Sequence, residues 1–465
     1  MNKITYFGSS ALWGMILLIN AASCRKAGDI KTTPVKPEIQ LLDESQRSPI
    51  ERIKVVHLYK DTVYILSKMF TRQPGEQLII DEGTLIKVNT STPTGGIANA
   101  GISIYPGGII QATGTRSNPI VFTSNDYTGN QKANWNGLVI RGNAPDNSAG
   151  PGGDPVDFSG TLSYVRIEFA PLILTAVGNR TIIDHIQVSY ASPSGSYEFD
   201  GGTFNARNLI SYACGGPGDF YITRGYTGKM QNILVIRHPF FGSTADVPLN
   251  TIAGLIIENN PDSSAAVTAT PFTFPVISNI TVLGPNTQNG SAPAYGDTNV
   301  ISGAVLTTRS SCFAIRNSLL AGFPVAGWRL DDAPTATYFR DSISEFSHCI
   351  VHANITERTF YLKPGTAASY SSSDFQNYVL APRFGNRLFT DIADLKLKDP
   401  FDYDRGPDAF PLEDSPVFTG STFDGKYFND AFFNRTNYIG ALGQEDWTLG
   451  WSNNLPLKTN YNFPH

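Results

Sequence analysis

Charged side chains are scarce in this sequence. Lys, Arg, Asp and Glu make up 16% of the 465 residues, whereas about a quarter of an ordinary soluble domain is charged. The 35 basic and 40 acidic residues give a formal net charge of −5. Because no positive excess is present to attract phosphate, we expect no nucleic-acid partner and no electrostatic attraction to an anionic membrane.

Cysteine is also rare, with four residues in the whole chain. Apart from Cys24 near the N-terminus, only Cys214, Cys312 and Cys349 remain. These three allow at most one disulfide, so stability cannot depend on a disulfide framework. Their spacing leaves open whether any two of them pair, and because it matches no zinc-binding pattern we expect no zinc site.

The signatures of several reaction classes are missing as well. The sequence contains no GxSxG turn, no HExxH pair and no glycine-rich phosphate loop ahead of a helix. These motifs mark serine hydrolases, zinc proteases and nucleotide-binding enzymes. We therefore expect a binding protein before an enzyme.

Glycine, proline and aromatic residues are plentiful by comparison, with 43 Gly, 30 Pro, 28 Phe and 20 Tyr. Glycine and proline mark turns, while Phe and Tyr are enriched in strands and supply buried area to a core. This composition predicts a folded, turn-rich, all-β protein.

The N-terminus has the parts of a secretory signal. Lys3 precedes an apolar stretch at residues 7–22, and small residues stand before Cys24. The stretch is too short and too interrupted for a comfortable transmembrane helix. A Cys directly after small residues resembles a bacterial lipobox, although Ala21 stands where Leu is more usual.

That resemblance implies that residues 1–23 are removed and that Cys24 carries the lipid. Residues 24–49 then form a flexible tether. The expected partner is the membrane, through the lipid, and the expected location is the outer membrane, facing the periplasm or the cell surface. An ordinary secretory signal with an incidental cysteine is the alternative.

Six short apolar segments recur in the middle of the chain at intervals of 21 to 25 residues. Helical repeats and propeller blades need longer periods, so this period predicts a parallel β-solenoid with one strand in register per coil. The expected inward positions form two columns. The first column is Val165, Ile186, Leu209, Ile233, Leu255 and Ile280, and the second is Ile167, Val188, Ser211, Val235, Ile257 and Val282.

A partial asparagine column accompanies these segments. Asn208, Asn232 and Asn279 stand just before the strand positions and predict a stacked turn, although Tyr164, His185 and Gly254 interrupt the column. We predict a β-helix over residues 50–420. Because a rod of parallel strands must hide its open ends, we also expect an N-terminal cap near residues 50–80 and an aromatic-rich C-terminal cap at residues 421–465.

Several blocks of sequence resemble one family. They are WNGLVIRGNAP at 135–145, SGTLSYVRIE at 159–168, EFDGGTFN at 198–205, GYTGK at 225–229, YIGA at 438–441 and DWTLGW at 446–451. In this order they resemble right-handed parallel β-helix lipoproteins of Gram-negative bacteria, which are often mislabelled as transporters. The resemblance implies the right-handed fold and an extracytoplasmic setting, and it implies no established activity or ligand.

Members of that family often carry acidic clusters ahead of the GYxGK-like turn, which suggest cation binding. Here residues 215–224 keep one acid, Asp219, and add Arg224. Glu198 and Asp200 lie two residues apart on a predicted strand and so share one face. Surface hydrogen bonding, cation binding and acid catalysis all remain open for this pair. Calcium is the one cofactor that these candidates allow.

The function expected from the sequence is a lipid-anchored, noncatalytic interaction with glycan or with the cell surface. The first alternative is a polysaccharide lyase or glycoside hydrolase on a β-helix scaffold. The second is a structural spacer or a protein-binding adhesin. Aromatic residues of the C-terminal stretch are expected mainly to form its own core, with a minority presenting a surface on which sugar rings stack.

Overall fold

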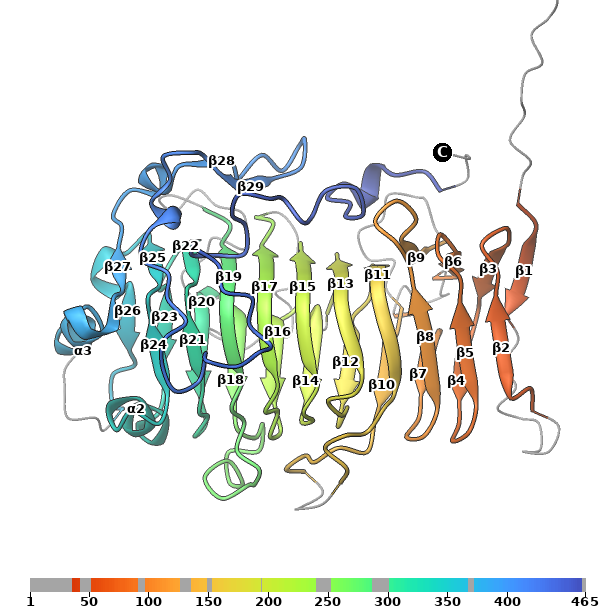
Figure 1. Ribbon diagram of the computed structural model, residues 1–465, viewed down its shortest axis with the longest axis horizontal. Coiled ribbons are helices and arrows are strands. Elements are labelled where there is room, and N and C mark those ends of the chain that lie inside the picture. Colours follow the sequence, from red (N-terminus) through yellow and green to blue (C-terminus); the bar gives the residue numbers. More distant parts are fainter. Residues whose placement is uncertain are drawn as a thin grey trace, which may run out of the picture. The chain divides into compact units, whose positions relative to one another are not determined.

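Consecutive coils of the chain stack into a right-handed parallel β-helix (Figure 1). The computed structural model describes residues 36–41, 52–90, 97–125, 135–148, 153–193, 195–239, 252–286, 301–366 and 372–461. The predicted signal peptide, Cys24 and most of the predicted tether lie outside these residues. Residues 37–460 form one compact unit. Within the described ranges, no helix is long and apolar enough to cross a membrane.

The described strands form a 17-stranded sheet, a ten-stranded sheet and a two-stranded sheet. Each coil contributes one strand to the ten-stranded sheet. These strands are β4 (Met69–Arg72), β7 (Gly101–Ile104), β10 (Leu138–Arg141), β12 (Leu172–Thr175), β14 (Tyr197–Asp200), β16 (Gly218–Thr223), β18 (Ile252–Glu258), β20 (Ile301–Thr308), β23 (Trp328–Leu330) and β26 (Phe360–Leu362).

The 17-stranded sheet consists of two parallel rows. The strands that belong only to the first row are β2 (Val55–Leu58), β5 (Gln77–Ile80), β8 (Ile109–Thr113), β21 (Ala314–Arg316) and β24 (Glu345–Ser347). The strands that belong only to the second row are β1 (Glu38–Leu41), β3 (Val63–Leu66), β6 (Leu85–Val88), β9 (Ile120–Ser124), β22 (Leu319–Phe323), β25 (Ile350–Ala353) and β27 (Arg387–Leu388). Five long strands span both rows: β11 (Gly160–Glu168), β13 (Ile182–Ser189), β15 (Asn205–Tyr212), β17 (Lys229–Ile236) and β19 (Val276–Leu283).

A bend separates the two rows, and each coil bends at the same place. The bend residue has a positive φ, from 51° to 59°, in every long strand and between β21 and β22 and between β24 and β25. These residues are Tyr164, His185, Asn208, Asn232, Asn279, Asn317 and His348. The left-handed conformation costs most residues about 1–2 kcal/mol and asparagine less, which explains the asparagine column. Tyr164 and His185 belong to this column and do not interrupt it.

The two predicted inward columns are buried in the core. Val165 pairs with Ile186, and Ile233 pairs directly with Ile280. One segment was assigned to the wrong sheet, because residues 254–257 belong to β18, which pairs with β16 and β20 in the ten-stranded sheet. Leu255 and Ile257 do point inward, but from another side of the coil. Alternation distinguishes inside from outside and does not distinguish one sheet from another.

Two helices cover the last coils. Phe339 of α2 (Ala333–Arg340) and Phe375 of α3 (Ser372–Val379) lie 5.0 and 5.3 Å from the ring of Trp328. Residues 55–80, where we expected a cap, form strands β2 to β5 of the first described coils. Short 3-10 helices follow the strands at η1 (Thr356–Arg358), η2 (Pro382–Phe384), η3 (Ile392–Leu395), η4 (Pro416–Phe418) and η5 (Pro456–Lys458).

The C-terminal segment lies along the side of the coils, which differs from the predicted cap (Figure 1). After the antiparallel pair β28 (Leu397–Asp399) and β29 (Asp408–Pro411), the chain runs back beside the bends. We call residues 419–455 the strap. Phe423, Phe428 and Phe433 of the strap are buried and cluster with Ala314 of β21.

Side-chain amides at and near the bends hold the strap. Gln187, Gln231 and Asn317 each form two hydrogen bonds to one strap residue, donating to its carbonyl and accepting from its N–H. Their partners are Asn453 (2.8 and 2.7 Å), Asn434 (2.7 and 2.9 Å) and Thr422 (3.0 and 3.0 Å). These amides pair with the strap backbone as a neighbouring strand would, so the contact depends little on the strap's side chains.

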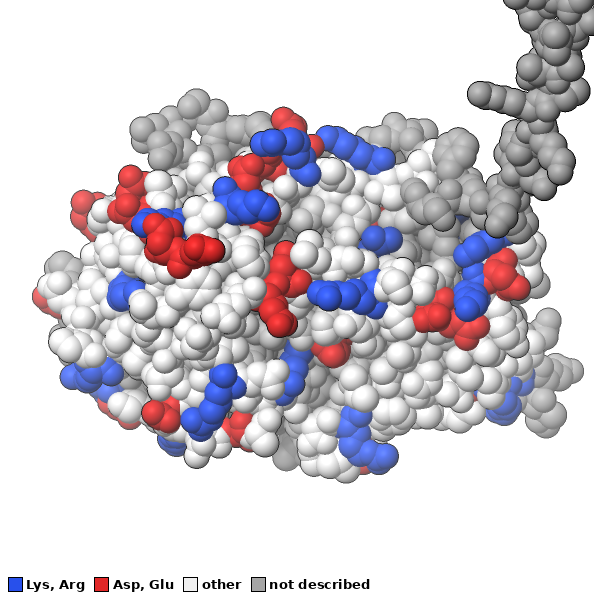
Figure 2. Space-filling model, turned by 45° about the horizontal axis from the view of Figure 1, so that its top comes forward, with Lys and Arg blue, Asp and Glu red and all other residues white. Residues whose placement is uncertain are grey.

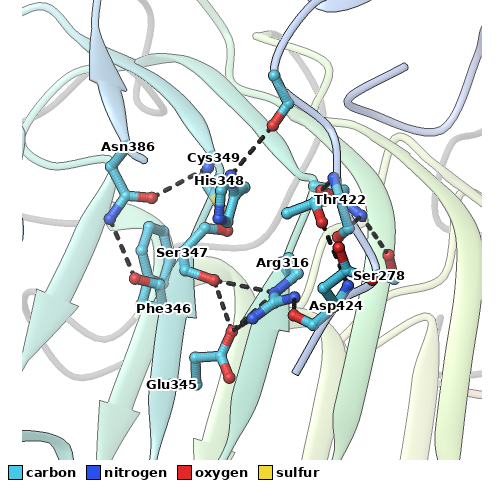
Figure 3. Close-up of polar contacts among 12 residues, drawn as sticks. Ser278, Arg316, Glu345, Phe346, Ser347, His348, Cys349, Asn386, Thr422 and Asp424 are labelled. Atoms are coloured by element: carbon cyan, nitrogen blue, oxygen red, sulfur yellow. Dashed lines mark hydrogen bonds and ion pairs between the residues drawn. The ribbon is translucent and has the colours of Figure 1, made fainter. Parts of the chain in front are cut away.

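Further contacts fix the end of the strap nearest the last coils (Figure 3). Arg316 donates to Glu345 and Ser347 of β24 and to the backbone carbonyl of Asp424. His348, at the next bend, contacts the carbonyl of Gly420 at 3.1 Å. The bend row is therefore both the corner of the coil and the attachment site of the strap.

Comparing two bend residues tests this role of the amides. Asn279 is fully buried and donates to Thr436, Tyr438 and Gly440 of the strap, whereas Asn208 has the same backbone conformation and no hydrogen bond to the strap among the described residues. Glycine tolerates a positive φ. We expect N279G to lower the free energy of unfolding by about 2–4 kcal/mol, because buried partners are left unpaired, and N208G to change it by less than about 1 kcal/mol.

Urea unfolding of the two variants checks this expectation. Equal losses in N279G and N208G would mean that the strap contacts add nothing beyond the bend itself.

Candidate functional site

The outer face of the ten-stranded sheet carries the predicted carboxyl pair. In β14, Tyr197 and Phe199 point into the core and are fully buried, while Glu198 and Asp200 alternate with them and face outward. The prediction that both carboxyls share one face of a strand agrees with this placement.

The neighbouring coils bring further polar side chains beside this pair. Glu198 is in register with Tyr221 of β16, and Asp200 with Thr223. In the next coil, Tyr221 is in register with Ile256 of β18, and Glu258 ends that strand. The outward positions of three successive coils therefore form one polar cluster.

Tyr221, Glu258 and Arg309 form a connected chain of contacts. The hydroxyl of Tyr221 donates to Oε1 of Glu258, and Oε2 of Glu258 lies 3.0 Å from Nη1 of Arg309. The same Arg309 nitrogen donates to the carbonyl of Pro261 at 2.5 Å. Glu258 is only 3% exposed, so this chain of contacts compensates for burying its carboxylate.

Burial raises the pKa values of all three carboxyls. The pKa of Glu198 rises to about 7, chiefly because of burial and then because of repulsion from Asp200. Burial also raises the pKa of Asp200, although attraction to Arg224 opposes the rise. The pKa of Glu258 is raised by burial and lowered in part by its hydrogen bond from Tyr221. Near neutral pH, Glu198 therefore holds a proton for part of the time.

One side chain in the cluster lacks a partner. Thr223 is fully buried, and within the described part of the chain its hydroxyl oxygen has no hydrogen bond. An unpaired buried hydroxyl costs free energy that a bound polar molecule or water can recover. Its position in β16, between Asp200 and Glu258, places this unsatisfied group in the middle of the cluster.

Two loops stand beside the cluster, one after β10 and one after β18 (Figure 1). Asn147 of the first loop donates to the carbonyls of Asn259 (2.9 Å) and Pro271 (3.0 Å) in the second loop. The backbone N–H of Asn147 also donates to the carbonyl of Arg224 at 2.9 Å. These bonds join the loops at the carboxyl ends of β16 and β18 and hold the border of the cluster in place.

The structure brings together three of the four predicted candidates. Arg224 follows β16, adopts a φ of 54° and donates its backbone N–H to Asn259. Its guanidinium opposes the raised pKa of Asp200, so it belongs to the cluster with Glu198 and Asp200.

Asp219, the fourth candidate, has a different place. It is fully buried, its Oδ2 lies 2.7 Å from Nε of Arg237, and its Oδ1 accepts a hydrogen bond from Ser211 at 2.6 Å. An internal ion pair of this kind holds two parts of the coil together and offers no carboxylate to a ligand. Including Asp219 with the other three candidates was therefore incorrect.

Four residues of the cluster were not predicted from the sequence: Tyr221, Thr223, Glu258 and Arg309. Glu258 was missed because its strand was assigned to the wrong sheet. Once residues 252–258 are placed after β16 in the ten-stranded sheet, alternation alone puts Glu258 beside Thr223.

The structure also bears on metals and thiols. Across the described residues, no group of three or more His, Cys, Asp or Glu side chains is arranged to hold a metal ion, and calcium stays a prediction. Cys214, Cys312 and Cys349 are buried free thiols.

Figure 2 shows the molecule with the top of the Figure 1 view turned forward. Acidic and basic side chains are scattered there among wide uncharged areas. No continuous basic stripe is visible on this face.

The raised pKa of Glu198 makes stability depend on pH. The pKa is about 7 in the folded protein and about 4.3 in an unfolded chain, so the folded state binds the proton more tightly. Ionisation of Glu198 therefore costs stability as pH rises between these two values. We expect the unfolding free energy of the wild type to fall relative to that of E198Q by about 2–3 kcal/mol between about pH 4.5 and pH 8.

Urea unfolding of both proteins at several pH values measures this difference. The matched control is E445Q, which removes an exposed carboxyl of the strap. Parallel pH profiles for the wild type and E198Q would contradict the raised pKa.

Of the comparisons with known proteins, the one with protein families gives a match. No curated protein and no solved structure is similar enough to this chain to count as a match. A family model described as a pectate-lyase-like beta helix domain matches residues 50–378. Because the match covers more than half of the chain and the structure has the corresponding stacked coils, this chain belongs to the family of pectate-lyase-like β-helix proteins.

Proposed function

We propose that this protein is a lipid-anchored, extracytoplasmic β-helix that binds a polysaccharide without cleaving it. The binding surface is the outer face of β14, β16 and β18. The observation that carries this proposal is the outward cluster of Glu198, Asp200 and Tyr221, whose side chains are half-buried, beside the buried carboxylate of Glu258.

The chemistry of the cluster suits sugar hydroxyls. Carboxylate oxygens accept hydrogen bonds from hydroxyl groups, and the tyrosine and threonine hydroxyls can donate or accept. Successive coils repeat such groups about every 4.8 Å, so the face offers contacts at intervals along an extended chain. A row of such groups on three successive coils matches a polymer better than a compact metabolite.

The charge of the cluster favours a neutral or amino sugar. Three carboxyls, those of Glu198, Asp200 and Glu258, meet two guanidinium groups, those of Arg224 and Arg309. A uronate polymer would bring further negative charge against partly buried carboxylates, which raises the free energy of binding. A bound cation would reverse this preference, so calcium belongs in the experiment.

Affinity electrophoresis of the full chain through gels containing one polysaccharide each tests the proposal. We expect a neutral polysaccharide to retard the wild type while the polymer stays intact. We expect D200N and Y221F to reduce the retardation, because each removes a hydrogen-bonding group from the cluster. D424N is the matched control for loss of one charge, since the side chain of Asp424 is 89% exposed on the strap.

Each remaining outcome of the gels has a definite meaning. Loss of retardation in the presence of chelator would place a cation in the site. Equal retardation of the wild type, D200N and Y221F would move the binding surface elsewhere. No retardation in any gel would remove the glycan proposal and leave a structural spacer or a protein-binding adhesin.

Glycoside hydrolysis is the second candidate function, and the pKa of Glu198 favours it. A glycoside hydrolase needs one carboxyl that stays protonated beside a second that is ionised. Glu198, with a pKa of about 7, lies next to Asp200 on the same face of β14. A cleared zone in the gel that disappears in E198Q would establish cleavage.

The proposed anchor is Cys24, and the proposed location is the outer membrane. We expect the wild type to incorporate a labelled fatty acid during growth of a Gram-negative host and C24S to incorporate none, because the thiol that would carry the lipid is absent. Mass spectrometry of the mature N-terminus gives the cleavage site. Labelling of C24S equal to that of the wild type would contradict lipidation at this residue.

A further inference from the structure

A cavity of about 310 Å³ lies on the side of the molecule that carries the strap. Ile210 of β15 and Leu234 of β17 line its floor. These two residues are in register on adjacent coils and alternate with the inward positions, so they face outward. Residues 405–409 and the strap residues 446, 448, 449 and 452–455 line the walls. Ligand sites usually enclose about 300–1,000 Å³, so this cavity has room for one small molecule.

The lower part of the cavity is apolar. Ile210 and Leu234 are 1% and 5% exposed, and Ala409 and Leu442 beside them are buried as well. Moving a compact hydrocarbon group from water onto such a floor is favourable, because apolar surface is removed from water.

The wall carries both hydrogen-bond donors and acceptors, and the side-chain donors of its Thr, Ser and Asn residues already have partners. Oδ1 of Asp446 accepts from the backbone N–H (2.9 Å) and the hydroxyl (2.6 Å) of Thr448. Ser452 donates its hydroxyl to the carbonyl of Thr448, and Asn454 donates its amide to the carbonyl of Pro407. Because these donors already have partners, what the wall has left for a ligand is the lone pairs of its oxygens, above all those of the Asp446 carboxylate.

Of the charged side chains in the lining, Asp446 is the one without a direct ion pair among the described residues. The carboxylate of Asp408 lies 2.8 Å from the Lys398 ammonium. Arg405 forms ion pairs with Asp402 and Asp399, and its side chain is 80% exposed. Both of these lining charges thus have direct ion-pair partners, whereas the Asp446 carboxylate accepts hydrogen bonds only from Thr448 among the described residues and is attracted by the Lys398 ammonium at longer range.

We propose that this cavity binds a small organic ammonium ion with a compact apolar body. The apolar body rests on Ile210 and Leu234, and the ammonium donates to the carboxylate of Asp446. The cavity belongs to the 17-stranded sheet, and the proposed polysaccharide surface belongs to the ten-stranded sheet. The two sites are therefore separate, and the inference does not depend on the proposed function.

The test uses cyclohexylamine, which is protonated at neutral pH, and cyclohexanol, which has the same ring without the charge. Ligand-observed NMR titrations of the full chain measure both affinities. We expect the amine to bind at least about tenfold more tightly than the alcohol, the factor expected for one charge-assisted hydrogen bond. D446N should weaken amine binding by about the same factor and leave alcohol binding unchanged.

Two further variants keep the test decisive. L234F fills the floor of the cavity and should abolish binding of both probes. D414N, which removes an exposed carboxylate outside the cavity lining, should bind the amine as the wild type does. Circular dichroism confirms that each variant is folded. Failure of the wild type to bind the amine, equal amine binding by D446N and the wild type, or undiminished binding by L234F would each overturn the proposal.

Discussion

A left-handed bend at the same residue of successive coils is the constraint on which the rest of the structure depends. From Tyr164 to His348 the chain adopts a positive φ at this point, and each bend fixes where one strand row ends and the next begins. Because the bends are in register, the side chains on either side of them form continuous columns. Inward columns build the core, and the polar side chains near the bend form the row to which the strap binds.

This arrangement gives the two sides of the coil different roles. On the bend side, Gln187, Gln231 and Asn317 use their amides on the strap backbone, so polar groups that might bind a ligand are already paired with the protein itself. On the ten-stranded sheet, Glu198 and Asp200 point outward, and Thr223 keeps an unpaired hydroxyl. The strap thus covers polar groups on the bend side, whereas the carboxyls of Glu198 and Asp200 face outward beside Tyr221 on the ten-stranded sheet, and this contrast is the physical basis of the proposed function.

Most of the fold could be predicted from the sequence because burial and alternation leave a direct signal. The inward columns through Val165 and Ile167, and the asparagines at the bend, follow from residue type and spacing alone. The order of sheets around the coil could not be predicted in the same way, because residues 254–257 have the same alternation as a bend-side strand. That single misplacement hid Glu258, and Asp219 was misjudged because nothing local in the sequence indicates its long-range partner Arg237. The course of the strap depends on contacts between residues far apart in the chain, such as Gln187 with Asn453.

Hydrogen–deuterium exchange with and without a neutral polysaccharide tests most directly the claim that the ten-stranded sheet carries the ligand. We expect slower exchange of backbone amides in residues 197–200, 218–224 and 252–260 when the polymer is present, with little change in the strap. Protection confined to residues 419–455, or protection nowhere in the chain, would contradict it.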